Sequence, residues 1–181
     1  MPSNRFDQPK AEKRFELVQA ACRLFLQYGF DRTSVSRIAA EAGVTPNTIY
    51  WYFKDKDDLL LAVNDQFVQK HMKVYLADMV DKPLSEQLVW LVNQLKPFNG
   101  LITTVHNRIH SSEAVRKWHS GFHALMERLL IMQLPGAQPT DGFDADIQII
   151  GFTIEGMISH DLNQKDINKI CQALTQRIGG V

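Results

Sequence analysis

Apolar residues recur with the period of an α-helix along almost the whole chain, and no segment alternates apolar and polar residues as a half-buried strand would. The pattern is clearest in residues 10–28, which Gly29 follows as a typical helix-ending residue. The apolar residues on one face of this segment are Phe15, Val18, Cys22 and Phe25, and the face is widened by Leu17, Ala21, Leu24 and Tyr28. The chain is therefore predicted to have an all-α fold.

Two short helices are predicted next. The first carries its apolar residues at helical spacing between Val35 and Ala42, with Thr33 as the predicted N-cap and Gly43 as the break. Thr45 can cap the second, which has Pro46 at the position where a missing N–H costs nothing. A short helix, a glycine-containing turn and another short helix predict a helix-turn-helix motif at about residues 34–53.

The second short helix has two unlike faces. Ile49 and Phe53 are four residues apart and are expected in the core. The opposite face carries Asn47, Tyr50, Trp51 and Lys54, with Thr48 at its margin. Such a face suits a major groove, since asparagine can bond adenine bidentately and apolar edges can touch thymine methyl groups. Taken alone, the segment also fits an αα turn that binds nothing and aromatics that belong to a core.

Further helices are predicted to the end of the chain, at about 55–80, 84–96, 99–110, 113–133, 144–160 and 164–178. The segment "LPGAQPTDG" is the clearest loop because it is rich in turn residues. Two domains are expected: residues 1–60, which contain the helix-turn-helix motif, and residues 61–181, which contain the remaining helices. The helix at 55–80 would connect them.

Composition agrees with a soluble, cytoplasmic protein with no membrane partner, because charged residues interrupt every apolar run. The chain has 181 residues, of which 45% are hydrophobic and 22% charged, and its formal charge is zero. Residues 1–54 hold eight Lys and Arg against five Asp and Glu, a local charge of +3 that favours a DNA-facing N-terminal part. Cys22 and Cys171 have no metal-ligand or disulfide pattern and are expected to be reduced core residues.

Catalysis is not predicted, because motifs such as GxSxG, HExxH and the phosphate-binding glycine loops are missing from the sequence. No cofactor and no metal are expected. The HxxxH spacings at His106/His110 and His119/His123, with Glu113 nearby, would place imidazoles on one helical face and so allow a metal site. Histidines on helices are more often ordinary polar residues. A helical enzyme and a protein-interaction module stay as alternatives.

The segments "IAAEAGV" and "TIYWYFKDKDDLL", after a first helix with "LF" and "YGF", closely resemble the DNA-binding part of the TetR family of bacterial transcriptional regulators. The resemblance covers about residues 11–62. It implies an N-terminal three-helix DNA-binding domain followed by a helical effector and dimerisation domain. It also implies phosphate contacts from Thr33, Thr45, Tyr52 and Lys56, to which the residue pattern adds Lys54. Groove contacts are implied for Pro46, Asn47, Thr48, Tyr50 and Trp51.

One position departs from the family pattern. Many members have a basic residue where this chain has Ser36, and here the arginine follows one residue later, at Arg37. A shift of one residue turns the side chain by about 100° around the helix. Both residues are counted with the DNA-binding set, but more of the base readout is expected from Asn47 and Tyr50.

The last two predicted helices carry apolar stripes, which either intramolecular packing or a subunit interface would explain. The resemblance favours an interface, because family members pair these helices across a two-fold axis in a four-helix bundle. The expected interface residues are Ile147, Ile150, Gly151, Ile154, Ile158, Ile167, Ile170 and Leu174.

These features predict a homodimeric, ligand-responsive repressor of a palindromic DNA operator. Large apolar side chains in the middle helices suggest a pocket for a small, mainly apolar effector, although ordinary core packing would explain them as well. The pocket residues would be Trp90, Leu91, Phe98, His106, Trp118, Phe122, Met126 and Phe152. Alternatives are a regulator that acts as an activator and one that needs no ligand.

Overall fold

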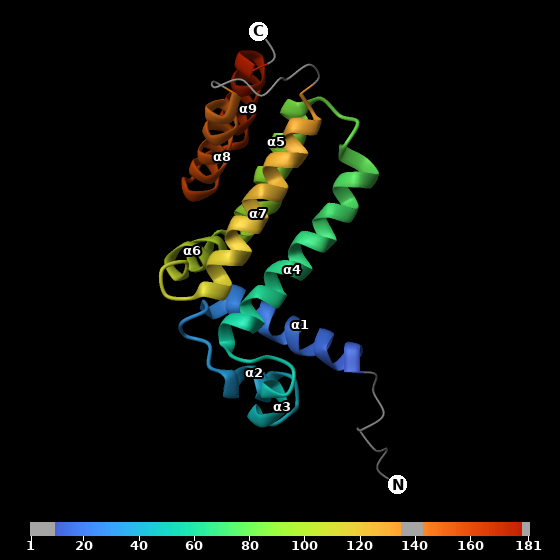
Figure 1. Cartoon of the computed structure of the whole chain (residues 1–181), viewed down its shortest axis with the longest axis vertical. Coiled ribbons are helices and arrows are strands. Elements are labelled where there is room, and N and C mark those ends of the chain that lie inside the picture. Colours follow the sequence, from blue (N-terminus) through green and yellow to red (C-terminus); the bar gives the residue numbers. More distant parts are fainter. Residues whose placement is uncertain (1–9, 135–142, 179–181) are drawn as a thin grey trace. The chain divides into compact units, whose positions relative to one another are not determined.

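Every regular element in the described parts of the chain is a helix (Figure 1), so the all-α prediction is confirmed. The structure is a computed structural model that describes residues 10–134 and 143–178. Its α-helices are α1 (Lys10–Tyr28), α2 (Val35–Glu41), α3 (Pro46–Tyr50), α4 (Lys56–Val74), α5 (Leu84–Leu95), α6 (Asn99–Arg108), α7 (Glu113–Met132), α8 (Phe143–Ser159) and α9 (Gln164–Ile178). The predicted loop "LPGAQPTDG" begins at Leu134 and otherwise lies outside the described residues.

The segment predicted as one helix over 55–80 is not α-helical throughout. After α4 the chain continues as a π-helical turn, Tyr75–Met79, in which the amide of Val80 donates to the carbonyl of Tyr75 at 2.9 Å. The extra residue in such a turn changes the direction of the following side chains, and π-helical turns are frequent at functional sites. A short 3₁₀ turn, Lys96–Phe98, links α5 to α6.

The chain forms two compact units. The first contains the described residues up to Gln69 together with Gly100–Arg116, and the second contains Lys70–Asn99 together with the residues from Lys117 onward. Helix α4 begins in the first unit and ends in the second. The first unit is larger than a three-helix DNA-binding domain because most of α6 and the start of α7 belong to it.

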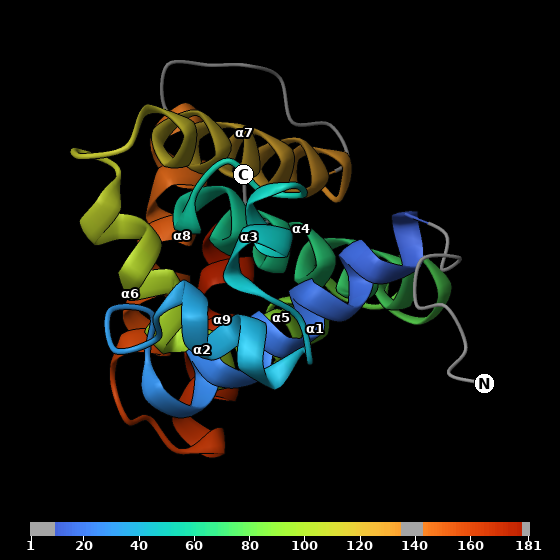
Figure 2. The ribbon, with the colours of Figure 1, turned by 90° about the horizontal axis from the view of Figure 1, so that it is seen from below.

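The core of the first unit lies between α1, α2, α3 and the first part of α4. Leu17, Ala21 and Leu24 form the centre of the buried face of α1. Phe15, predicted on this face, is 54% exposed, because the buried face is rotated toward Leu17 and Ala21. Figure 2 views these helices from below.

The second unit is built on α5, which packs against both α8 and α9. Its buried side chains include Leu88, Val92, Ile150 and Ile167. Cys171 is also buried there as a free thiol, and burial raises its pKa to about 11. The thiol is therefore protonated at neutral pH and behaves as the expected reduced core residue.

An ion pair fastens α6 to the start of α4 within the first unit. Arg108 Nη2 donates to Asp57 Oδ2 at 2.7 Å, and Arg108 Nε lies 2.6 Å from Asp57 Oδ1. The Arg108 guanidinium also lies over the ring of Phe30, 5.1 Å from its centroid. Burial alone would raise the pKa of Asp57, but its hydrogen bonds to Arg108 and Ser112 and the nearby positive charges outweigh this and lower the pKa.

We predict that Asp57→Asn lowers the free energy of unfolding at pH 7 by about 1 to 2 kcal/mol, the usual contribution of a partly solvated hydrogen-bonded charge. Because the pKa of Asp57 is lower in the folded chain, this contribution is complete above about pH 4 and is lost as pH falls through the folded pKa. Urea unfolding at several pH values measures it, with Arg108→Gln and the double variant completing a mutant cycle. Additive effects of the two substitutions would contradict the pairing.

Candidate nucleic-acid interface

The α2–turn–α3 motif is held by local hydrogen bonds. Ser34, and not Thr33 as predicted, caps α2, since its Oγ accepts from the amide of Arg37 at 3.1 Å. Gly43 has φ +66°, a left-handed conformation that glycine adopts without steric cost and that suits the tight turn. Thr45 caps α3 through the amide of Thr48, with Pro46 at the first helical turn, as predicted.

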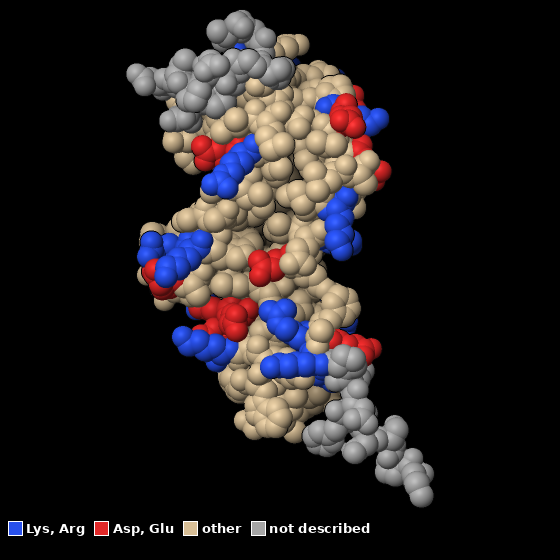
Figure 3. All heavy atoms as spheres, turned by 45° about the vertical axis from the view of Figure 1, so that its right-hand side comes forward, with Lys and Arg blue, Asp and Glu red and all other residues tan. Residues whose placement is uncertain are grey.

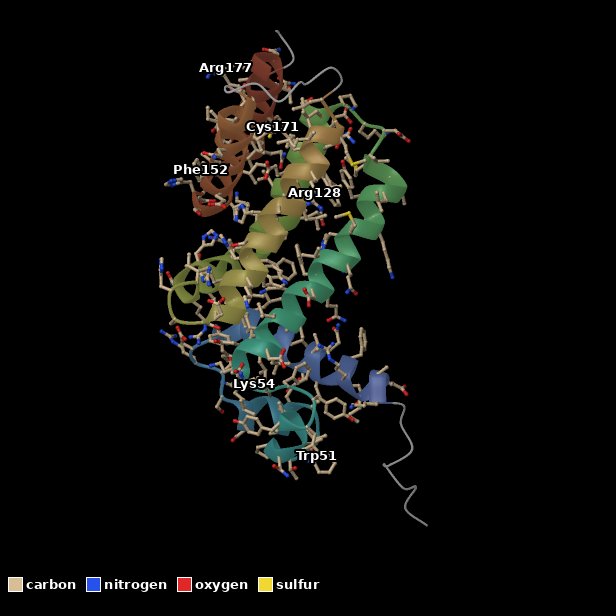
Figure 4. All side chains as sticks on the ribbon, in the orientation of Figure 1. Trp51, Lys54, Arg128, Phe152, Cys171 and Arg177 are labelled. Carbon is tan, nitrogen blue, oxygen red and sulfur yellow. The ribbon has the colours of Figure 1, made fainter. Side chains whose placement is uncertain are left out.

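Helix α3 is anchored on one side and open on the other. Ile49 and Phe53 are both buried in the core of the first unit. Asn47 and Tyr50 are exposed, and Trp51 is 74% exposed. Figure 4 shows Trp51 at the end of the first unit, and Figure 3 shows that end as a mainly uncharged surface bordered by Lys and Arg side chains. Tyr50, the last residue of α3, and Trp51, its C-cap, are therefore available to a partner.

Thr33 does not present its hydroxyl to solvent. The residue is 0% exposed, and Oγ1 donates to the carbonyl of Gly29 at 2.8 Å, with the carbonyl of Leu24 3.3 Å away. The side chain thus satisfies carbonyls at the end of α1 instead of facing a phosphate, which corrects the expected role of Thr33. The sequence could not show this because threonine suits a buried turn and an exposed cap equally well.

Arg37 is turned toward α1. Its guanidinium carbon lies 3.6 Å from the centroid of the Tyr28 ring, a cation–π arrangement on the protein surface. Ser36 is exposed on the same helix. A second surface contact connects α1 to α2, since Arg23 Nη2 lies 3.0 Å from Glu41 Oε1. In this conformation the guanidinium of Arg37 contacts the Tyr28 ring, so Arg37 could contact a DNA base only if this cation–π contact were broken.

The expected phosphate contacts differ in their exposure. Lys54 and Thr45 are exposed, and Tyr52 is half-buried. Lys56 lies with Nζ 4.0 Å from the centroid of the Phe30 ring, and burial is the main reason that its pKa is lowered. Lys54 is therefore the better-placed cation beside α3, and a phosphate contact from Lys56 stays a prediction.

In the second unit, several predicted pocket residues are half-buried. These are Trp90, Leu91, Phe98, Trp118, Phe122 and Met126. Two others differ: His106 belongs to α6 in the first unit, and Phe152 is 69% exposed on α8 and so does not line an interior pocket. Figure 4 shows Phe152 pointing away from α5 and α7.

Trp90 and Phe98, both predicted pocket residues, lie in one aromatic group with His71 and Tyr75, which sequence analysis missed. We define the aromatic group as these four residues. The His71 ring lies 6.3 Å from both Trp90 and Phe98, and the Tyr75 ring lies 6.1 Å from Trp90. His71 is four residues before Tyr75, a spacing that puts two residues on one helical face and could have revealed the pair. The π-helical turn begins at Tyr75 itself.

A polar network supports this aromatic group. The hydroxyl of Tyr75 donates to Oε1 of the buried Gln87 at 2.7 Å. Gln87 Nε2 in turn donates to the carbonyl of Lys82 at 2.7 Å and to Gln133 Oε1 at 2.9 Å. Burial raises the pKa of Tyr75, so the phenol stays protonated and remains a donor at neutral pH. A buried glutamine with satisfied donors fixes the direction of the tyrosine.

Five of the eight predicted interface residues are buried within the chain itself. They are Ile147, Ile150, Ile158, Ile167 and Leu174. Gly151, Ile154 and Ile170 are half-buried. Among the described side chains of α8, the large apolar ones that are exposed are Ile149, at 52%, and Phe152. The expected interface stripe is therefore corrected: most of it is intramolecular core, and an interface on α8 would use the face with Ile149 and Phe152.

Of the two predicted HxxxH pairs, one lies on a single helical face in the structure and the other does not. Helix α6 ends at Arg108, so His110 lies beyond the helix and does not share its face with His106. Glu113 pairs with Arg116. His119 and His123 lie one turn apart on α7, with their Nε2 atoms 3.0 Å from each other. Only the second spacing therefore places two imidazole nitrogens together.

None of the described helices is long and apolar enough to cross a membrane.

Comparison with known proteins shows the fold of the chain and a family match for its N-terminal segment. The family model described as "Bacterial regulatory proteins, tetR family" matches residues 17–63, the segment that contains α2 and α3. Residues 17–63 therefore resemble this family of bacterial regulators, and the curated proteins and solved structures reported below as similar to the chain are regulators.

Among curated proteins, the chain is 30% identical over 83 residues to the fatty acid metabolism regulator protein of Bacillus subtilis, which covers 46% of this chain and 43% of that protein. It is 50% identical over 52 residues to the transcriptional regulator AcrR of Shigella flexneri, which covers 29% of this chain and 24% of AcrR. These matched stretches span less than half the length of either relative.

Solved structures share the fold over nearly the whole chain. The fatty acid degradation regulator FadR of Bacillus halodurans has a TM-score of 0.66 at 22% identity, covering 96% of this chain and 98% of FadR. FadR of Bacillus subtilis in complex with stearoyl-CoA has a TM-score of 0.60 at 20% identity, covering 92% and 98%. The similarity extends over α4 to α9 as well as the segment matched by the family model.

Proposed function

We propose that the chain is a homodimeric, ligand-responsive transcriptional repressor that binds a palindromic DNA operator. The observation that carries the proposal is the exposure of Asn47 and Tyr50 on α3 and of Trp51 at its C-cap, while Ile49 of α3 and the following Phe53 are buried. A helix-turn-helix reads DNA by placing its second helix in the major groove. The family match over residues 17–63 supports this role for α3.

The exposed side chains of α3 can supply direct base readout. The Asn47 amide can donate to and accept from adenine, and the rings of Tyr50 and Trp51 can contact thymine methyl groups or the sugar edge. Pro46 and Thr48 lie beside them. Phosphate contacts would come from Lys54, Thr45 and Tyr52, which position the helix without reading sequence.

A dimer would use the exposed face of α8. Ile149 and Phe152 are large, apolar and exposed, and side chains of this kind mark interaction surfaces when they lie together. An isologous dimer gives two copies of α3, which must reach half-sites about 34 Å apart on one side of the duplex. This two-fold arrangement is the reason that a palindromic operator is proposed.

The aromatic group in the second unit is the proposed effector site. Its members combine large apolar rings with the His71 imidazole and the Tyr75 hydroxyl, a composition typical of ligand pockets. The two FadR proteins with this fold make a long-chain acyl-CoA the first effector to test. Binding near Tyr75 would act on the end of α4, the helix whose beginning lies beside α3, and thereby weaken operator binding.

We predict that Asn47→Ala weakens specific operator binding by about 1 to 3 kcal/mol and relaxes the base preference at one position of each half-site. Lys54→Ala should weaken specific and non-specific binding alike and lower the salt slope by about 1, because a phosphate contact carries no sequence information. Fluorescence anisotropy on a fragment from upstream of the gene, at several salt concentrations, measures both.

Lys165→Ala serves as the matched control for these DNA measurements, since Lys165 is an exposed lysine on α9. Equal loss of sequence discrimination in the Asn47 and Lys54 variants would contradict the assigned roles. If no fragment is bound in preference to random DNA, the proposal of an operator is wrong.

We predict that Phe152→Arg weakens the dimer by at least about 30-fold, because a charge would be placed in the centre of an apolar interface and hot-spot side chains contribute about 2 kcal/mol or more. Sedimentation velocity at micromolar concentration measures the change. Leu76→Arg is the control, since Leu76 is an exposed apolar residue outside α8. Dimerisation that survives Phe152→Arg would remove α8 from the interface.

We predict that stearoyl-CoA changes the tryptophan fluorescence and binds more weakly when operator DNA is present. Coupling is reciprocal, so a ligand that weakens operator binding a hundredfold, about 2.7 kcal/mol, must bind the DNA complex a hundredfold less tightly. Trp90→Phe should remove most of the signal in the absence of DNA, whereas Trp51→Phe should retain it. A ligand with equal affinity in both states is not the inducer, and choline serves as a comparison of different chemistry.

A further inference from the structure

Two exposed cations of α1 belong to the surface beside the helix-turn-helix motif. Arg14 is exposed, and its guanidinium carbon lies 5.0 Å from the centroid of the Phe53 ring. Phe53 follows α3 and its C-cap Trp51, and it directly precedes the exposed Lys54. Lys10, also exposed, comes four residues before Arg14 and therefore lies on the same face of α1. We call Lys10 and Arg14 the α1 basic face.

No carboxylate of the described residues neutralises the α1 basic face. Neither Lys10 nor Arg14 forms an ion pair with an Asp or Glu in the described ranges. Lys13 differs, although it is on the same helix, because its Nζ lies 2.5 Å from Glu16 Oε2. The helix itself thus supplies a partner for Lys13 and leaves the charges of Lys10 and Arg14 directed at solvent.

The α1 basic face is unfavourable for α1 alone. The positive end of a helix dipole lies at its first turn, so cations in the first two turns weaken the helix. A polyanion reverses this effect, because exposed Lys and Arg side chains gain free energy when they release the counterions condensed on DNA. The contacts would come from the ammonium and guanidinium groups, whose long side chains can follow the DNA backbone.

We propose that the α1 basic face binds backbone phosphates of double-stranded DNA beside the half-site that α3 reads. This inference rests on the proposed operator binding and makes the contacted DNA longer than the bases that α3 can reach. Arg14 lies against Phe53 and so contacts the phosphate nearer to α3, whereas Lys10 is about 6 Å farther along α1. In the view from below in Figure 2, α1 extends to one side beyond α3. Such contacts position the protein without reading sequence.

The salt dependence of DNA binding by the full-length chain tests the inference. With a random-sequence duplex as the probe, Lys10→Gln and Arg14→Gln should each lower the slope of log K against log salt concentration by about 1. Arg14→Lys keeps the charge and should keep the slope. An arginine that only covers the Phe53 ring would leave the slope unchanged in every variant. Circular dichroism establishes that each variant is folded, and Lys10→Gln leaves the contact between Arg14 and Phe53 in place.

The length of the duplex gives a second readout. For the fragment from upstream of the gene, a duplex trimmed to the palindrome should bind more weakly than one with about 5 further base pairs, half a helical turn, on each side. The double variant of Lys10 and Arg14 to Gln should bind both duplexes equally, because it cannot use the added phosphates.

Lys165→Gln is the matched control, since it makes the same change of charge at an exposed lysine of α9. It should keep both the salt slope and the gain from the longer duplex. The inference is wrong if Lys165→Gln lowers the slope as much as Lys10→Gln, or if the double variant keeps the slope and the gain. Asn47→Ala separates the two proposals: its loss of base preference would still support operator binding where the α1 basic face fails.

Discussion

The burial of Ile49 and Phe53 is the interaction on which the arrangement of the first unit depends. Helix α3 has only five residues, and an isolated helix of that length is not stable in water. Its position must therefore come from packing, and the two buried side chains supply it. Because Ile49 of α3 and Phe53, three residues beyond its end, are both buried, Tyr50 and the C-cap residue Trp51 are left exposed. An apolar anchor thus determines which residues can reach a groove.

The same unit shows why little charge is needed on α3 itself. Base readout uses neutral amide and ring edges, while affinity comes from phosphate contacts around them. Lys54 is placed for that role, whereas Arg37 and Lys56 are directed at the rings of Tyr28 and Phe30. In the proposed regulator, these two cations stabilise the protein surface beside the DNA and contribute to the local potential more than to individual contacts.

Helical periodicity was sufficient to predict the extent of most elements, including α1 at 10–28 and α9 at 164–178, because their apolar faces are continuous. Periodicity could not tell the buried face of α8 from its exposed face, because α8 carries apolar residues on both. Ile150 is buried in the core, whereas Ile149 and Phe152 are exposed. Thr33 and Ser34 are both good caps, so only the three-dimensional turn decides between them. The i, i+4 spacing could have revealed the pair of His71 and Tyr75, but the apolar pattern does not predict the π-helical turn that begins at Tyr75.

Helix α4 carries the two features through which an effector could act on the DNA-binding unit. Its first turn holds Asp57, which is bound to Arg108 of α6, and its last turn holds His71, followed by Tyr75 in the π-helical turn. A ligand that moves His71 and Tyr75 must move the end of a helix whose beginning is fixed by an ion pair. Because Arg108 lies at the end of α6, that helix would receive the movement as well. In the proposed mechanism, coupling between effector binding and DNA binding therefore requires only α4 and the ion pair between Asp57 and Arg108. Substitutions can alter either of them without changing α3.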